Sequence, residues 1–153
     1  IPAGQSADEM VDLCDVYATV LDAAGVDVPS DAQDEIDSPG ASFLPLLTSG
    51  ETGWKDTQFC EYGNARMART ASHKLVMRYP GPNGTFPNEL YDLESDPRER
   101  LNCYEDAAYT EVRADLAAKL KAHFARYEIA ERSGADIMNQ PMCNPNEPWR
   151  AEL

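Results

Sequence analysis

ELYDLESDPRERLN, residues 89–102, is the stretch of sequence that decides the fold, because it joins a strand to a sharp exit. Glu89–Leu93 has the length and the composition of a short strand. Asp96-Pro97 follows three residues later, and proline fixes one backbone angle, so the chain enters a turn or a helical cap there. Asn102 can close that turn by bonding its own backbone. The stretch predicts a final strand, followed by a turn and a helical region.

Three more short strands precede this one along the chain. They are predicted at Thr57–Tyr62, Arg66–Thr70 and Lys74–Tyr79. Turn-forming residues separate them at positions 63–64, 71–72 and 80–84. Because consecutive short strands with tight turns pair as hairpins, we expect a four-stranded antiparallel sheet.

A long amphipathic helix is predicted at Tyr109–Ile129. Its apolar side chains Val112, Leu116, Leu120 and Phe124 repeat every four residues, which places them on one helical face. That face should lie across the sheet. The remaining residues, 133–153, are rich in proline and asparagine and have little periodicity, so we expect an irregular, extended tail.

A further helix is predicted near the start of the chain, at Ala7–Ala24. Ser6 and Glu9 have the spacing of a capping box. The apolar surface of this helix is broad, so it should pack against a larger body. Ser42 resembles the N-cap of a short helix over Phe43–Leu47 that ends at Gly50. Together these elements predict an α+β fold.

Composition excludes several classes of function. The chain has 153 residues and a formal net charge of -14, which repels a phosphate backbone and argues against nucleic-acid binding. No run approaches the roughly 20 apolar residues of a membrane span, and no signal peptide is visible. The four cysteines are far apart, which argues against a zinc site and leaves disulfides open.

Four blocks of sequence, in this order and spacing, resemble the C-terminal portion of a sulfatase of the arylsulfatase type, in the alkaline-phosphatase-like superfamily. They are DEMVDLCDVYATVLDAAGV (8–26), GASFLPLL (40–47), RTASHKLV (69–76) and the opening stretch, residues 89–102. The resemblance covers about residues 1–127, and the last block is its most specific part. It implies that residues 1–50 end a catalytic α/β domain, that 51–132 form the C-terminal subdomain, and that 133–153 are the tail.

The resemblance also implies the chemistry. Family members hydrolyse sulfate esters with a formylglycine made within a C/S-x-P-x-R motif, beside a divalent cation, usually Ca²⁺, held by Asp and Asn side chains. Both the motif and the Ca²⁺ ligands are expected upstream, outside this chain, so we expect no catalytic and no metal-binding residue here. Cys143-Asn144-Pro145 has the C-x-P spacing, but Glu147 replaces the arginine, and a coil cysteine is expected instead.

The best candidates for substrate binding are Glu61, Asn64 and Arg66. They lie in the short stretch 61–66 that joins two predicted strands, and they combine a carboxylate, an amide and a guanidinium. Arginine pairs well with a sulfate or a sugar carboxylate. Ordinary turn polarity also explains the same residues and is the simpler interpretation, and both interpretations stay open.

The other candidates are expected to be structural or solvated. His73 and His123 should pack or face solvent, although histidine can act as a general acid. The acidic cluster Asp31, Asp34, Glu35 and Asp37 lacks the order of a calcium-binding loop, so it should be a solvated loop.

Several alternatives remain at this stage. The activity could be that of a phosphonate or phosphate ester hydrolase of the same superfamily, or the chain could be a non-catalytic assembly module. The expected partners are a sulfated small molecule or sugar, the N-terminal catalytic domain, and a second copy of the chain through the exposed first helix. The sequence leaves open which sulfate ester is cleaved, and whether the location is periplasmic, secreted or cytoplasmic.

Overall fold

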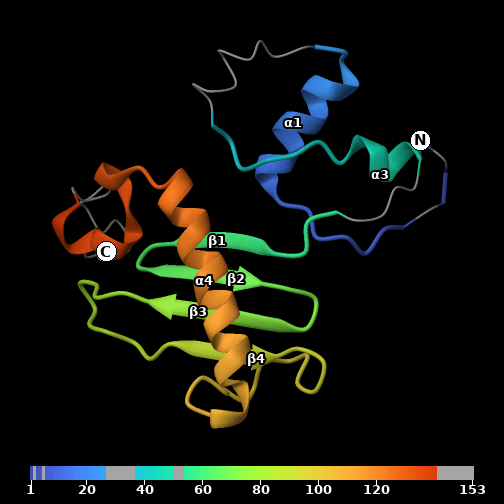
Figure 1. The fold of residues 1–153 in the computed structure, drawn as a ribbon. Coiled ribbons are helices and arrows are strands. Elements are labelled where there is room, and N and C mark those ends of the chain that lie inside the picture. The colour runs from blue at the N-terminus through green and yellow to red at the C-terminus, as the bar shows by residue number, and fades with distance from the viewer. Residues whose placement is uncertain (2, 5, 27–36, 50–53, 141–153) are drawn as a thin grey trace, which may run out of the picture.

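A computed structural model describes residues 1, 3–4, 6–26, 37–49 and 54–140. The helices are α1 (Leu13–Ala23), α3 (Leu44–Thr48) and α4 (Thr110–Tyr127), and the strands are β1 (Gln58–Tyr62), β2 (Ala65–Arg69), β3 (His73–Arg78) and β4 (Glu89–Asp92). Three 3₁₀ segments, η1 (Ala107–Tyr109), η2 (Ala130–Arg132) and η3 (Gly134–Asn139), flank α4 on its two sides. Figure 1 shows α1 and α3 beside a unit formed by the sheet and α4.

The four strands form one antiparallel sheet in the order β1-β2-β3-β4. Spatial order therefore equals sequence order, as a succession of hairpins requires. The predicted α+β fold and its four-stranded antiparallel sheet are confirmed, with strand ends that differ by one residue from those predicted.

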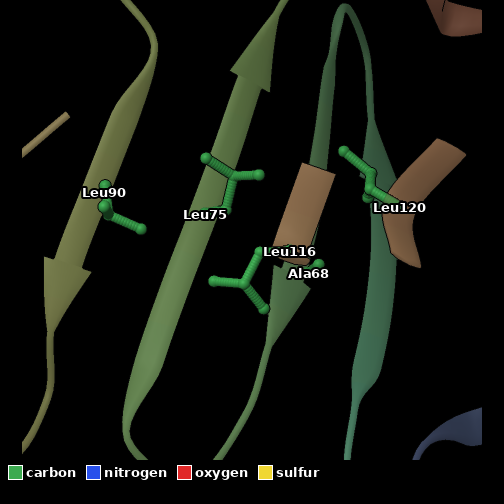
Figure 2. Close-up of a cluster of buried hydrophobic side chains, with 5 residues drawn as sticks. All are labelled: Ala68, Leu75, Leu90, Leu116 and Leu120. Carbon is green, nitrogen blue, oxygen red and sulfur yellow. The ribbon is translucent and has the colours of Figure 1, made fainter. Parts of the chain in front are cut away.

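Helix α4 crosses one face of the sheet (Figure 1). Five buried side chains form the core between them, Ala68, Leu75, Leu90, Leu116 and Leu120 (Figure 2). The strand residues of this core face one another across the register, because Leu75 pairs with both Ala68 and Leu90. Val112 and Phe124 pack against the cluster, so the predicted apolar stripe of the helix is confirmed.

The exit from β4 is built by side chains that bond to backbone. The Asp92 carboxylate accepts hydrogen bonds from the backbone N–H groups of Glu94 and Ser95, at 3.0 and 3.1 Å. Asn102 does more than close its own turn. Its Oδ1 accepts from the N–H of Leu90 at 3.0 Å, and its Nδ2 donates to the Asn88 carbonyl at 2.9 Å. The segment after the turn is therefore held along the outer edge of β4.

The start of α1 differs from the prediction. The helix begins at Leu13 rather than Ala7, and its capping box is made by Asp12 and Asp15 rather than by Ser6 and Glu9. The reason lies outside the helix: the Lys55 ammonium lies 2.7 Å from Asp12 Oδ2 and 2.5 Å from Asp15 Oδ2. The Lys55 ammonium stabilises the capping box of Asp12 and Asp15, which therefore forms in place of one made by Ser6 and Glu9.

The short helix α3 also lacks its predicted cap. Its N-cap residue is Phe43, with no side-chain hydrogen bond, while the Ser42 hydroxyl donates to Asp22 Oδ2 on α1 at 2.5 Å. The segment before α3 is fastened to α1 by two further bonds: Ala41 N–H donates to Asp15 Oδ1 at 3.0 Å, and Phe43 N–H donates to Thr19 Oγ1 at 3.0 Å. The predicted end at Gly50 lies outside the described residues.

Helix α1 leaves large apolar side chains open to solvent. Leu13 is 88 % exposed and Val20 is 60 % exposed. Self-association through this surface stays a prediction. Among the described residues, no helix has the length and apolar character needed to cross a membrane.

Candidate functional site

The predicted substrate-binding residues lie at one end of the sheet. The β1–β2 and β3–β4 connections meet there because both hairpins turn at the same side of an antiparallel sheet. Asn64 joins the two connections: its carbonyl accepts from Tyr79 N–H at 2.9 Å, and its side-chain Nδ2 donates to the Tyr79 carbonyl at 2.5 Å. The amide of Asn64 thus fixes the start of the β3–β4 loop.

Arg66 is buried at the centre of this end. Its Nε donates to Glu61 Oε1 at 2.8 Å, and its Nη2 donates to Glu128 Oε1 at 2.5 Å and to Ser133 Oγ at 3.0 Å. The guanidinium carbon lies 4.1 Å from the ring centroid of Phe124. Burial opposes the charge, but the hydrogen bonds to Glu128 and Glu61 outweigh it and raise the pKa of Arg66 above its ordinary value.

Residues 128–140, which we call the C-terminal strap, follow α4 and return to the β1–β2 hairpin. Gly134 N–H donates to Glu61 Oε1 at 3.1 Å. A Cβ at Gly134 would lie 2.0 Å from the carbonyl oxygen of Gly63, so only glycine allows this approach. The predicted extended tail is wrong over Gly134–Asn139, which form 3₁₀ turns held by these contacts. Positions 141–153, with Cys143, lie outside the described residues.

The structure therefore brings Glu61 and Arg66 into direct contact and places Asn64 on the adjoining turn. Contact of these three residues with a substrate stays a prediction. Sequence reasoning missed Glu128, Ser133 and Gly134, which lie in the segment after α4 and complete the cluster around Arg66. No local pattern indicates them, since Glu128 is 62 positions from Arg66 in the sequence.

Both histidines pack against aromatic rings. His73 lies 6.0 Å from the ring of Tyr109. His123 stacks on Phe59, with ring centroids 4.0 Å apart and planes at 14°. It lines a groove of about 1100 Å³, together with Leu13 of α1. Burial lowers the pKa of His123 below its ordinary value of 6.5.

This shift makes stability depend on pH with a definite sign. The folded state binds fewer protons at His123 than the unfolded state, so the contribution is complete above pH 6.5 and is lost as the pH falls from there towards the folded pKa. Urea unfolding at pH 8 and pH 5 should show a smaller loss of stability for His123→Phe than for the original chain. Equal losses of stability in the two proteins would contradict a lowered pKa for His123 in the folded state.

The described residues contain no group of three or more His, Cys, Asp or Glu side chains that could hold a metal ion. In the acidic cluster, Asp37 pairs with Arg126 at 3.2 Å, and positions 31–35 lie outside the described residues.

Most of the chain is similar in sequence to known proteins. The sequence model of a family described as "N-sulphoglucosamine sulphohydrolase, C-terminal" matches residues 1–126. An N-acetylglucosamine-6-O-sulfatase from Bacteroides thetaiotaomicron is 31% identical over 140 residues, which cover 84% of this chain and 24% of the relative. The chain thus spans about a quarter of the length of this relative.

Two solved structures share the fold. One is a complex with its substrate D-glucosamine-2-N,6-O-disulfate; it has a TM-score of 0.58 and 31% identity, and the match covers 74% of this chain and 24% of that chain. The other is a phosphonate monoester hydrolase of Agrobacterium radiobacter, with a TM-score of 0.57 and 29% identity over 72% of this chain and 24% of that chain.

Proposed function

Because this chain belongs to the sulfatase family, through its match to the N-sulphoglucosamine sulphohydrolase C-terminal model, we propose that it is the C-terminal part of a longer enzyme that hydrolyses a sulfate ester. The observation that carries the proposal is the family match over residues 1–126, which includes α1, the whole sheet and nearly all of α4. A sulfated amino sugar is the favoured substrate class, since the relative and the solved complex described above act on such compounds by name.

In this proposal the chain shapes the substrate pocket, and the nucleophile and the Ca²⁺ ligands come from the preceding catalytic domain. The end of the sheet with Glu61, Asn64 and Arg66 faces the substrate. Asn64 sets the position of the β3–β4 loop through Tyr79. Arg66 sets the distance between the hairpin and the end of α4 through Glu61 and Glu128. When bound elsewhere in the enzyme, a divalent cation would stabilise the charge that develops on the sulfate oxygens.

The phosphonate ester alternative has one observation in its favour, the similarity to the phosphonate monoester hydrolase. Both reactions displace a leaving group from a tetrahedral anion, and a C-terminal part that only shapes the pocket would serve either one. The identity of the reacting group therefore has to be determined with substrates.

The test uses the longer gene product that contains this chain and, separately, the 153-residue chain. The longer protein should release inorganic sulfate from N-acetylglucosamine 6-sulfate, and the isolated chain should release none above buffer. A phosphonate monoester offered at the same concentration should react more slowly. Turnover of the phosphonate without release of sulfate would establish the alternative, and sulfate release by the isolated chain would refute the proposed division of roles.

A further inference from the structure

We propose that Glu128 is a specificity-determining residue: it adds a second carboxylate to the ion pair of Arg66 with Glu61, and the excess negative charge excludes a second anionic group from this end of the substrate pocket. The inference rests on the proposed function and narrows it. The favoured substrates are sulfate esters that carry no further sulfate or carboxylate at the position that faces the β1–β2 hairpin.

The two acidic side chains of the cluster are more exposed than the basic one. The Arg66 side chain is only 7% exposed, whereas those of Glu61 and Glu128 are 30% and 31% exposed. A group that approaches this end of the sheet therefore meets the two glutamate side chains before it meets the guanidinium. Phe124 and Tyr79 lie over the guanidinium at 4.1 and 5.5 Å from their ring centroids, which further limits access to it.

The charges do not balance. One guanidinium is paired with two carboxylates, at 2.8 and 2.5 Å. The hydrogen bonds from Ser133 and Arg66 lower the pKa of Glu128, so this carboxylate is ionised at neutral pH. The cluster then carries one net negative charge. It repels an anionic group placed within a few ångströms, by an amount that corresponds to about tenfold in affinity at a partly exposed site.

The second carboxylate comes from the C-terminal strap, beyond the residues that the family model matches. Arg66 and Glu61 lie within the matched range of 1–126, and Glu128 lies just after it. Within the matched range Arg66 forms one ion pair, so its charge is balanced there; the strap adds the excess negative charge. This makes Glu128 a feature that can tune selectivity without altering the common scaffold.

The test compares kcat/KM of the longer protein for a doubly and a singly sulfated glucosamine, and the readout is the ratio of the two. Glu128→Gln keeps the size of the side chain and an acceptor for Arg66, but removes one negative charge. We expect this variant to raise the doubly-over-singly sulfated ratio about tenfold, and the gain should shrink in 1 M salt because exposed charges are screened there.

Two further variants separate charge from packing. Glu128→Asp keeps the charge, and its ratio should stay near that of the original protein. Glu131→Gln removes an exposed charge from the same strap, at a residue for which the described part of the structure shows no ion pair, and should leave the ratio unchanged. The rate of tryptic cleavage after Arg132 reports whether the strap stays docked in each variant.

An unchanged ratio for Glu128→Gln with a docked strap would overturn this inference and leave the proposed function intact, provided that the singly sulfated sugar is hydrolysed. A tenfold rise in Glu131→Gln as well would also overturn it, since the effect would then be one of net charge. Failure of the longer protein to release sulfate from either sugar would overturn the proposed function itself.

Discussion

Lys55→Met is expected to lower the free energy of unfolding by about 3 kcal/mol, because it leaves a buried carboxylate without its cation. Asp15 is fully buried, and Lys55 Nζ lies 2.5 Å from its Oδ2. Methionine keeps most of the apolar stem of lysine and removes only the ammonium. Chemical denaturation monitored by circular dichroism gives the difference.

The matched control for this prediction is Lys119→Met. Lys119 also contacts two carboxylates, but Asp56 and Asp115 are 81% and 64% exposed, so the loss should be below about 1 kcal/mol. Adding Asp15→Asn to Lys55→Met should recover part of the lost stability, since asparagine has no charge to bury. Equal losses from the two lysine variants would show that burial of Asp15 is not the cause.

Leu75→Ala is expected to destabilise the chain by about 3 kcal/mol through the cavity that it leaves. Leu75 is fully buried and belongs to the core cluster between the sheet and α4 (Figure 2). Thermal and urea unfolding should both show the loss.

Leu101→Ala makes the same chemical change at a side chain that is 66% exposed, and it should cost less than about 0.5 kcal/mol. A loss below about 1 kcal/mol in Leu75→Ala would mean that the cluster around it collapses to fill the space.

The sheet and α4 were predictable because their signals are local. Turn residues separate the strands, and an apolar residue every fourth position marks the helical face that covers Leu75. The contact of Glu61 with Arg66 was predictable to the same degree, since the two are paired across one hairpin and so project from the same face.

Other features depend on residues far apart in the sequence. Which residues cap α1 depends on Lys55, which lies 43 positions from Asp12 in the sequence. The position of the C-terminal strap depends on the close approach of Gly134 to the Gly63 backbone. In the sequence alone, Gly134 looks like an ordinary turn residue, because the backbone that faces it is not known. The partner of Arg66 was missed for the same reason: Glu128 resembles any solvated residue at the end of a helix.

The order of the strands has a consequence for how the polypeptide acquires its shape. Each strand pairs with its sequence neighbour, and only residues 93–109 separate the last strand from α4, so the loops that must close are short. Such a topology is typical of fast folding, hairpin by hairpin. The strand order of the sheet can thus be set by successive local pairings, without a contact between distant parts of the chain.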